Sequence, residues 1–591
     1  MTTRPSPSTL VEALEAVASR HDLGFSHWVD ETRPADFVSH ADLWRRARCL
    51  AAACLDMGLA PGDRIALILP DSAQFIAAMF GCMIAGMIAV PVYPPMNLNQ
   101  LATYLTNTSL ILRRAGCRLV ITDRQVRVAL GTLMSEVPGL RSVEEITVLE
   151  ERVDTHVEPR IAPPQADSIA FLQFTSGSTS QPKGVALTHA QLLANINAFG
   201  TALGMHDRKD VSAVSWLPLY HDMGLIGLVF GSIRFAVHTL FITPLLFLKR
   251  PSTWLRKISE LRAQISFAPN FAYGLCAKRI KDSELVGLDL SSIEVAGCGA
   301  EPIRRATLES FADRFGPFGF RREALLPCYG LAEHSLAATF TGRGAPMRCD
   351  TVDPEALAMG EARPGLGDNA IDVVCCGRPF PGHELRIEDD SGSELPERQV
   401  GHIRLKGPSV MSGYWDDPEM TAATLRDGWL ETGDLGYVKN NELYVCGRQK
   451  DVIIVQGRNY YPSDIEWQAG EVPGVRAGNV VAFGLFDATL GRECVIVAAE
   501  VRDPRAGQTI RDEVIARVLE ALSLRVDEVL TLPPGSLPKT SSGKLQRAKT
   551  AEFYRVGMLG QTNANFGKLG VIKHLAASQW GFVKAKLLKD R

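Results

Sequence analysis

The sequence lacks a strong net charge, a metal-binding cysteine spacing and an obvious leader. Its 591 residues contain 63 Lys and Arg against 66 Asp and Glu, a formal net charge of −3. The whole chain therefore offers no electrostatic basis for binding nucleic acid. The 12 cysteines are scattered, with no C-x-x-C spacing, and the first residues do not resemble a secretory signal. We expect reduced thiols in a cytoplasmic protein without a nucleic-acid partner.

One hydrophobic run approaches the length of a membrane span. Phe75–Val92 comprises 18 residues without a charge, which is the lower limit for crossing a bilayer. Gly86 and Pro91 divide this run, and the residues before it have the pattern of a strand, a turn and a helix start. The pattern predicts a buried helix of about 13 residues followed by a buried strand, and no transmembrane segment.

Short apolar runs alternate with amphipathic segments along the chain, which is 46% hydrophobic and 22% charged. This composition is typical of folded globular domains and excludes disordered, collagen-like and coiled-coil classes for most of the chain. Because turn residues bound the runs, they predict α/β layers with mainly parallel sheets. We expect strands at Arg64–Leu69, Arg118–Thr122, Ser168–Phe174, Ile293–Gly297, Glu384–Ile387 and Val452–Val455.

A loop rich in glycine and hydroxyl side chains follows one of these strands. The strand Ile169–Phe174 runs into Thr175–Ser180 (TSGSTS) and then Gln181–Gly184 (QPKG). Consecutive N–H groups, hydroxyls and a lysine can surround an anion, although the G-x-x-x-x-G-K-[ST] pattern is absent. Thr188 and Gln191 have the spacing of a helix capping box. The pattern predicts a phosphate-binding loop, and a flexible turn is the alternative.

This loop resembles the phosphate loop of the adenylate-forming (AMP-binding) superfamily of acyl-CoA ligases, adenylation domains and luciferases. Five further segments match the motifs of that superfamily in order. They are Gly299–Pro302 (GAEP), Pro327–Glu333 (PCYGLAE), Trp429–Asp434 (WLETGD), Gly447–Asp451 (GRQKD) and Leu537–Lys544 (LPKTSSGK). The resemblance implies a large N-terminal domain of layered α/β subdomains, residues 1–445. It also implies a small mobile α+β lid domain, residues 446–591, with a hinge near residues 448–450 at Lys450.

The reaction implied by this resemblance is attack of a carboxylate on the α-phosphorus of ATP, which gives an acyl-adenylate and pyrophosphate. A carboxylate with a pKa of about 4–5 is already ionised at neutral pH, so no general base is needed. The sequence accordingly contains no recognisable Ser-His-Asp or H-E-x-x-H pattern. Catalysis would depend on positioning and electrostatics.

Matched motif positions imply a role for each site residue. Glu333 would hold Mg²⁺ between the phosphates, and Lys544 would reach the α-phosphate and the attacking carboxylate. Asp434 would accept the ribose hydroxyls, with Arg448 nearby. The residues implied to bind the nucleotide are Thr175, Ser176, Gly177, Ser178, Thr179, Lys183, Gly299, Ala300, Glu301, Tyr329, Gly330, Leu331, Ala332, Asp434 and Arg448. Surface carboxylates and a solvated lysine are the alternatives for Glu333, Asp434 and Lys544.

His221 lies in the segment Trp216–Gly227 (WLPLYHDMGLIG), which resembles the acyl-gate motif of the same superfamily. The resemblance implies that the imidazole packs beside the reacting carboxylate, as a catalytic residue with Lys544 and Glu333. A hydrogen-bonded histidine of the core is the alternative. Asp222 fits a cap of the following helix and receives no role.

Apolar residues of mixed size follow His221 and recur at Phe267–Tyr273. They predict a pocket for a lipid tail, since each buried CH₂ contributes about 0.8 kcal/mol. No residue of these two runs would pair the ammonium group of an amino acid. The expected lining residues are Met223, Gly227, Asn270, Phe271 and Tyr273. Plain core packing is the alternative.

More than 40 residues separate Glu333 from Cys376, and their length is similar to the insertion that marks fatty acyl-AMP ligases. We place this insertion at about residues 341–372. The resemblance implies a medium- or long-chain fatty acid as substrate and a holo acyl carrier protein as acceptor, with the insertion restraining the hinge. A lengthened surface loop, a fatty acyl-CoA ligase and a non-catalytic nucleotide or lipid sensor are the alternatives. The sequence leaves the oligomeric state open, and a monomer is one of the possibilities.

The last motif is followed by a tail, Val571–Leu588, that mixes lysines with Trp580 and Phe582. This composition is compatible with a surface helix for a membrane or a carrier protein. Packing on its own domain is the favoured interpretation.

Overall fold

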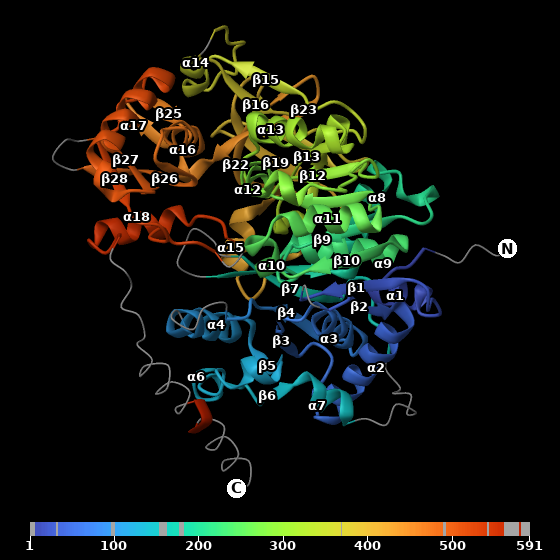
Figure 1. Ribbon diagram of the computed structural model, residues 1–591. Coiled ribbons are helices and arrows are strands. Elements are labelled where there is room, and N and C mark those ends of the chain that lie inside the picture. Colours follow the sequence, from blue (N-terminus) through green and yellow to red (C-terminus); the bar gives the residue numbers. More distant parts are fainter. Residues whose placement is uncertain are drawn as a thin grey trace.

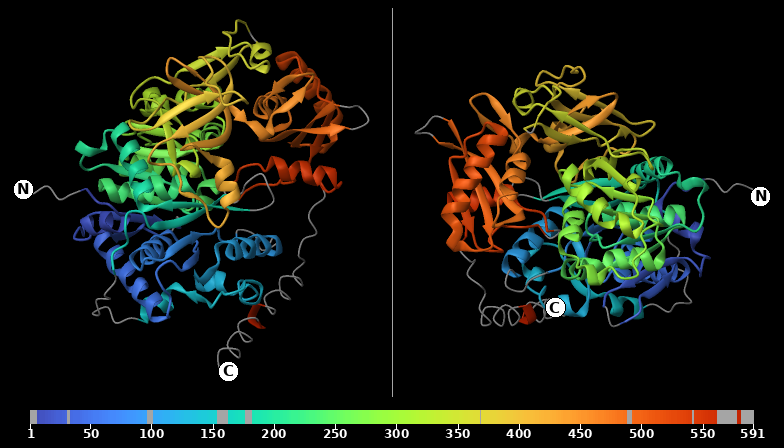
Figure 2. Two further views of the ribbon diagram at one scale, coloured as in Figure 1. Left: turned by 180° about the vertical axis from the view of Figure 1, so that it is seen from behind. Right: turned by 45° about the horizontal axis from the view of Figure 1, so that its top comes forward.

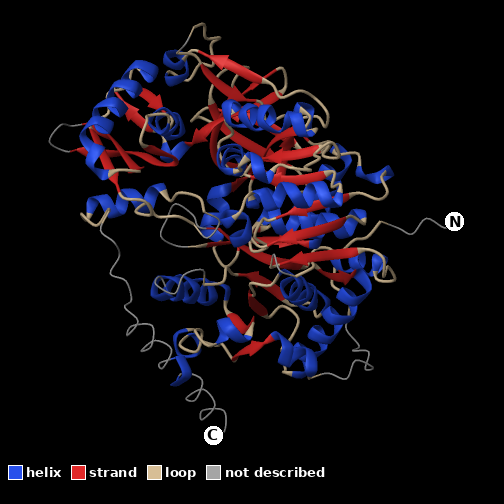
Figure 3. Ribbon diagram, in the orientation of Figure 1, coloured by secondary structure: helices blue, strands red, loops and turns tan. Residues whose placement is uncertain are grey.

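Two large sheets form the body of the N-terminal part. The C-terminal part from residue 452 to residue 560, here called the lid, lies to one side of this body (Figures 1 and 2). The computed structural model describes residues 6–30, 33–95, 101–152, 162–175, 182–367, 369–487, 492–540, 543–560 and 578–580. Helices cover the faces of the large sheets (Figure 3). Each of the six strands expected from the sequence is present, displaced at its ends by at most two residues.

The first sheet has seven strands in the order β20–β8–β7–β4–β3–β5–β6. Neighbours from β7 to β6 run parallel, whereas β8 and β20 are antiparallel additions. The strands are β3 (Arg64–Ile68), β4 (Ile88–Pro91), β5 (Cys117–Thr122), β6 (Ser142–Glu145), β7 (Ile169–Thr175), β8 (Lys183–Thr188) and β20 (Gly413–Tyr414). Helices α2 (His40–Asp56), α3 (Ser72–Ile84) and α4 (Leu101–Ala115) pack against it.

Alternate residues of β3 face two different cores. Ile65 and Leu67 pack with α2 and α3, whereas Ala66 and Ile68 pack with α4. A parallel strand covered on both faces needs apolar residues throughout, which explains its unbroken hydrophobic pattern.

The uncharged run Phe75–Val92 forms the end of α3 and then β4, as predicted. Gly86 makes the turn between them with φ of 68°, a conformation that favours glycine. Among the helices of the described ranges, none has the length and apolar character needed to cross a bilayer.

The second sheet has nine strands in the order β17–β14–β13–β12–β11–β9–β10–β1–β2. Its centre is parallel, and its edges are antiparallel. The strands are β1 (Gly24–Trp28), β2 (Asp36–Ser39), β9 (Ser212–Ser215), β10 (His238–Ile242), β11 (Ile265–Ala268), β12 (Val295–Cys298), β13 (Leu325–Gly330), β14 (Ala337–Phe340) and β17 (Arg378–Pro379). The longer helices beside it are α8 (His189–Ala202), α11 (Ser252–Leu261), α12 (Asn270–Arg279) and α13 (Arg305–Phe315).

The remaining sheets are smaller and largely antiparallel, unlike the mainly parallel sheets predicted. A third sheet of the body contains β18 (Glu384–Glu388), β19 (Gly401–Lys406), β21 (Leu425–Arg426), β22 (Trp429–Lys439) and β23 (Glu442–Arg448). The chain leaves β23 through a short 3₁₀ turn, Gln449–Asp451. This connection contains Lys450 and follows the predicted start of the lid by a few residues.

The lid is built around a three-stranded sheet with helices packed on it. Its strands are β24 (Ile453–Val455), β25 (Arg458–Tyr460), β26 (Val475–Asp487), β27 (Arg492–Val501) and β28 (Glu528–Leu532), of which the first two form a small hairpin. Its helices are α16 (Pro462–Gly470), α17 (Gly507–Leu522) and α18 (Arg547–Arg555). Lys544 lies between β28 and α18, so the lid carries this residue.

The predicted insertion forms an antiparallel ribbon of β15 (Cys349–Val352) and β16 (Ile371–Val374), with α14 (Pro354–Ala358) between the strands. Its side chains share a core with Tyr437 and Tyr444 of the third sheet and with Tyr461 of the lid. Asp350 anchors the ribbon, because this buried carboxylate accepts hydrogen bonds from Tyr437, Arg398 and Lys439. The insertion therefore contacts both parts of the chain.

Only three residues of the C-terminal tail, Ser578–Trp580, are described. The buried Ser578 hydroxyl accepts a hydrogen bond from the Gly131 N–H and donates one to the Val128 carbonyl. This point of the tail packs on the N-terminal part, which contradicts the interpretation that the tail packs on its own domain.

Replacing Asp350 with alanine is expected to loosen the insertion. Two partly buried cations would lose their counter-charge, which costs about 3 kcal/mol and corresponds to roughly hundredfold faster amide exchange of the ribbon. Hydrogen exchange followed by mass spectrometry at β15 and β16 measures this. Asp390→Ala is the matched control, because Asp390 is 96% exposed in its pair with His402 and such pairs contribute little. Equal exchange in the two variants would contradict the anchoring role.

Candidate active site

The predicted phosphate loop connects two antiparallel strands. The structure describes its two ends, where Thr175 of β7 pairs with Lys183 of β8. The predicted residues Ser176, Gly177, Ser178 and Thr179 lie outside the described residues. The capping box of Thr188 and Gln191, predicted to open α8, is confirmed.

Lys183 and Glu333 both contact the side chain of Tyr414. The Lys183 ammonium lies 5.2 Å from the centroid of the Tyr414 ring and 3.4 Å from the Met420 sulfur. The Tyr414 hydroxyl donates to Glu333 Oε1 at 2.9 Å. The structure thus brings the phosphate-loop lysine and the expected metal ligand into one neighbourhood.

The donor set at Glu333 fits Mg²⁺ in the presence of nucleotide. In the described part of the chain, no group of three or more His, Cys, Asp or Glu side chains is arranged to hold a metal ion. Mg²⁺ is usually bound by one or two carboxylates together with phosphate oxygens and water. Glu333 is such a carboxylate, and its Oε2 receives no hydrogen bond from the described residues.

The two segments expected to flank the adenine form a cradle, here called the adenine cradle, in which two backbones approach closely. A Cβ on Gly299 would lie 2.8 Å from the Cys328 sulfur, and one on Gly330 would overlap the Leu336 carbonyl. These positions therefore require glycine. Tyr329 precedes Gly330 at the end of β13, and Ala300 follows Gly299 with φ of 66°. Leu331 and Ala332 continue the chain beyond the cradle, and Ala332 is buried.

Glu301, expected as a nucleotide contact, also makes a contact within the protein. Its carboxylate accepts the Phe271 N–H at 2.6 Å, so it caps the first turn of α12. Burial raises the pKa of Glu301, and the positive charge of Lys544 opposes this. The side chain therefore stabilises the helix beside the cradle.

Three polar side chains converge where the ribose is expected. The Tyr329 hydroxyl donates to Asp434 Oδ2 at 2.7 Å, and Arg448 Nε lies 3.3 Å from Asp434 Oδ1. Asp434 and Arg448 are partners across β22 and β23. Burial raises the pKa of Asp434, while Arg448 and Tyr329 lower it. Asp434 is not the surface carboxylate considered as the alternative, because it is only 7% exposed.

Lys544 extends from the lid into the body. Its ammonium donates to the Ala300 carbonyl at 2.8 Å. Its own backbone is held by Thr540, since Lys544 N–H donates to the Thr540 hydroxyl and Thr540 N–H donates to the Lys544 carbonyl. A second link from lid to body is the ion pair between Arg304 and Asp464 at 2.8 Å. These contacts hold the lid with its lysine beside the adenine cradle.

His221 lies near this lysine in an apolar environment. Burial and, to a lesser extent, the charge of Lys544 lower the pKa of His221 to about 3. Its buried Nε2 atom has no hydrogen-bond partner among the described residues. The imidazole is therefore neutral, and it lacks the hydrogen bond at Nε2 that a satisfied core histidine would make.

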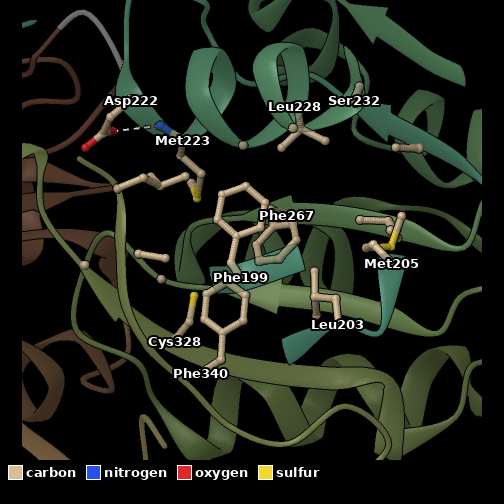
Figure 4. A pocket seen from close by; sticks show the side chains of 18 of the residues that line it. Phe199, Leu203, Met205, Asp222, Met223, Leu228, Ser232, Phe267, Cys328 and Phe340 are labelled. Carbon is tan, nitrogen blue, oxygen red and sulfur yellow. Dashed lines mark hydrogen bonds between the residues drawn. The ribbon is translucent and has the colours of Figure 1, made fainter. Parts of the chain in front are cut away.

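A mostly apolar cavity adjoins the adenine cradle (Figure 4). About 840 Å³ of space lies between its lining atoms, the open solvent at its mouth included. The eight-residue π-helix η3 (Met223–Phe230) forms one wall. The lining residues are Phe199, Leu203, Met205, Ala213, Asp222, Met223, Gly227, Leu228, Gly231, Ser232, Phe235, Val237, Ile265, Phe267, Gly299, Ala300, Cys328, Tyr329, Gly330, Leu336, Ala337 and Phe340.

Of the five residues expected to line an acyl pocket, Met223 and Gly227 lie in this lining, and three do not. The Asn270 side chain accepts the Arg304 N–H and so ties the start of α12 to the adenine segment. Phe271 packs edge-on against Trp216. Tyr273 is fully buried between Trp254 and Phe311, and its hydroxyl donates to the Gly297 carbonyl.

Sequence reasoning missed lining residues from other segments, among them Phe199 of α8 and Phe340 of β14. Their rings lie 6.4 Å apart, and Phe267, which belongs to one of the predicted runs, lies 6.0 Å from Phe340. Asp222 also lines the cavity, although its sequence position suggested only a helix cap. Its position directly after His221 was the available signal.

The His221 imidazole is expected to stay neutral at every pH at which the protein is folded and active. Because its folded pKa is lowered from 6.5 to about 3, the stabilisation from neutral His221 is complete above pH 6.5 and is lost as pH falls towards 3. NMR of the labelled imidazole, assigned with His221→Asn, should show no protonation down to about pH 5. A titration midpoint near 6.5 would contradict this environment.

Comparison with known proteins identifies the family. Residues 17–415 match the AMP-binding enzyme family. A Caulobacter vibrioides protein named provisionally as an acyl-CoA synthetase is 35% identical, with 93% of this chain and 96% of that protein aligned. A Moorena producens protein, the medium-chain-fatty-acid–[acyl-carrier-protein] ligase JamA, is 33% identical over 95% of this chain and 97% of its own length.

A solved structure from a study of fatty acyl-adenylate ligases of E. coli and L. pneumophila has the same fold. It superposes with a TM-score of 0.87 at 35% identity and covers 93% of this chain and 98% of its own. The fold, the family match and the full-length relatives agree with the resemblance found in the sequence motifs. The chain belongs to the AMP-binding enzyme family, the adenylate-forming enzymes, and within it is similar to the fatty acyl-adenylate ligases.

Proposed function

We propose that the protein activates a medium- or long-chain fatty acid with ATP and passes the acyl group to the phosphopantetheine thiol of an acyl carrier protein. The observation that carries this proposal is the hydrogen bond from Lys544 to the Ala300 carbonyl. Ala300 belongs both to the adenine cradle and to the lining of the apolar cavity. This position supports a role for the ammonium at the point where a nucleotide phosphate and the carboxylate of a bound acid would meet.

The cavity supports a fatty acid as the substrate. Its wall consists mostly of Phe, Leu, Met, Ile and Val side chains, and each CH₂ buried there contributes about 0.8 kcal/mol. Figure 4 shows Asp222 and Met223 at one end of the cavity and Met205 and Leu203 at the other. An extended chain with its carboxylate at the Asp222 end would reach towards Met205.

The first step needs charge compensation rather than proton transfer. The carboxylate oxygen attacks the α-phosphorus, the bond between the α-phosphorus and its bridging oxygen breaks, and pyrophosphate leaves. Lys544 offsets the negative charge of the two approaching anions. Asp434 and Tyr329 fix the ribose, and Glu333 with the phosphates would hold Mg²⁺, which would neutralise phosphate charge. His221 stays neutral and packs beside the carboxylate.

The second step requires the lid to withdraw Lys544 so that a thiol can approach. The thiol would lose its proton to water, and its sulfur would attack the acyl carbonyl carbon. The bond between that carbon and the phosphate oxygen of AMP would then break, so that the thioester forms and AMP leaves. The connection at Gln449–Asp451, which contains Lys450, is the expected pivot. The insertion shares a core with Tyr461 of the lid, and Glu355 accepts a hydrogen bond from Ser523 of the lid at 3.4 Å. These contacts support the expected restraint on the hinge, which the family resemblance associates with a carrier protein as acceptor, and they would rearrange when Lys544 withdraws.

A fatty acyl-CoA ligase is the second candidate, favoured by the name of the Caulobacter relative. The same adenylate would form, and only the acceptor thiol would differ.

The cysteines support a cytoplasmic location. All 12 of them are free thiols, which agrees with a reducing compartment.

A competition experiment tests the proposal. The purified protein receives ATP with magnesium, a series of saturated fatty acids, and equal amounts of CoA and holo carrier protein; apo carrier protein serves as the control. Pyrophosphate release measures adenylation, and intact-mass spectrometry measures acylation. We expect acylation of the holo carrier to exceed acyl-CoA formation by at least about tenfold.

Two results would contradict different parts of the proposal. Acyl-CoA formed faster than acylated carrier protein would favour the CoA ligase. Absence of pyrophosphate release with every acid would contradict adenylation itself and favour a non-catalytic sensor.

A further inference from the structure

Arg304 reaches from the body to the lid beside the adenine cradle. Its guanidinium pairs with Asp464 of the lid helix α16 at 2.8 Å (Figure 1). Both side chains are mostly buried, with 17% and 15% of their surface exposed. The Arg304 guanidinium also lies 5.8 Å from the centroid of the Trp467 ring on the same helix, within the range of a cation–π contact. The lid therefore presents an anion and an aromatic ring to one cation of the body.

The backbone of Arg304 is fixed within the body by two hydrogen bonds of opposite direction. The Arg304 N–H donates to the Asn270 side chain at 3.1 Å, and the Phe271 N–H donates to the Glu301 carboxylate at 2.6 Å. Both bonds join the start of α12 to the segment that follows Ala300. They keep the point at which Arg304 leaves the body in a fixed relation to the Ala300 carbonyl.

Within the lid, α16 is connected to the loop that carries Lys544. Glu466 of this helix accepts a hydrogen bond from Arg547 at 2.7 Å, and Arg547 follows Lys544 by three residues. Arg547 also donates to Asp451 at 2.7 Å, in the 3₁₀ turn that is the expected pivot. One arginine thus ties α16, the pivot and the lysine loop together, so that the position of α16 determines the position of the lysine.

The pair of Arg304 with Asp464 stabilises the docked lid and no other orientation. Rotation of the lid would separate the two side chains, because α16 moves with the lid and Arg304 stays with the body. In the docked orientation, removal of one partner leaves a mostly buried charge without its counter-ion, which is unfavourable. Once the lid has withdrawn, water solvates both groups, and removal of one costs little.

We propose that Arg304 is a positioning residue that favours adenylation over thiol transfer, because it holds the lid by Asp464 and Trp467 in the orientation that docks Lys544. This inference rests on the proposed two-step function. Adenylation needs the docked lysine, whereas thiol transfer needs its withdrawal. Weakening the pair should therefore slow the first step and leave the second step unchanged or faster.

Separate measurement of the two steps tests the proposal. Pyrophosphate release with ATP, magnesium and dodecanoic acid measures the first step. Intact-mass spectrometry measures the second, starting from preformed dodecanoyl-adenylate with holo carrier protein or CoA, each offered alone. Asp464→Asn keeps the shape of the side chain but removes its charge. Its first step should be slower by about tenfold or more, and its second step should be at least about half as fast as in the wild type.

Asp503→Asn is the matched control for the loss of a lid carboxylate. Asp503 pairs with Arg505 inside the lid, and the two side chains are 51% and 90% exposed. Exposed pairs of this kind contribute little, so this variant should leave the rates of both steps unchanged.

A double-mutant cycle tests whether Arg304 and Asp464 act as a pair. The adenylation rates of Arg304→Gln, Asp464→Asn and the double variant are compared with the wild type. Because Arg304→Gln already removes the cation, the further change at Asp464 should alter its rate by less than about threefold. Arg304→Lys keeps a positive charge and should retain more adenylation than Arg304→Gln.

Each outcome bears on a stated part of the account. Equal losses in both steps of Asp464→Asn would mean that the substitution merely damages the lid, which overturns the proposal. Near-normal adenylation in both single variants, or losses that multiply in the double variant, also overturns it. A wild-type protein that adenylates but acylates neither acceptor contradicts the proposed thiol transfer, and the cycle then decides the role of Arg304. Absence of pyrophosphate release from the wild type contradicts the proposed adenylation instead.

Discussion

The Lys544 ammonium joins the two parts of the molecule at the point where chemistry is expected. The lid carries this residue between β28 and α18, and the body supplies its acceptor, the Ala300 carbonyl. Ala300 adopts a left-handed conformation beside Gly299, whose missing side chain lets β12 and β13 approach closely. The close backbone packing, the turn and the docked lid together place one positive charge between the adenine cradle and the apolar cavity.

The positive charge of Lys544 shifts the pKa values of neighbouring titratable side chains. Burial raises the pKa values of Asp222 and Glu301, and Lys544 lowers both. The same charge contributes to the lowered pKa of His221. Lid docking, further held by Arg304 and Asp464, therefore sets the electrostatics of the site as well as its shape. A site built this way needs no proton-transfer group for an acid that is already ionised.

Sequence reasoning predicted those features whose signal is local. The uncharged run Phe75–Val92 indicated a buried helix and a buried strand. This local signal was sufficient because helices cover both faces of the first sheet, so that its strands are apolar throughout. Tyr329, Asp434 and Lys544 were assigned by resemblance to short motifs, and the structure brings them to one region. The antiparallel third sheet was not predicted, since strand direction depends on partners distant in the chain.

It was harder to predict which apolar side chains point into the cavity and which point into the core. Tyr273 and Phe267 occupy the same motif, yet Tyr273 is fully buried in the aromatic core and Phe267 lines the cavity. Helix rotation and sheet pairing decide this, and neither is encoded in the motif. Asp222 was missed because a helix cap accounts for one carboxylate oxygen, and only the cavity reveals the second.

The most direct test of the role of Lys544 compares the adenylation rates of Lys544→Ala and Lys539→Ala. Lys539 is the matched control, because it lies in the same loop and its ammonium donates to Asn479 within the lid. Pyrophosphate release with a fatty acid should fall by at least about a hundredfold in Lys544→Ala, and ATP affinity should change by less than about tenfold. Lys539→Ala should retain adenylation. Near-normal adenylation in Lys544→Ala, or an equal loss in both variants, would contradict the central role of the docked lysine.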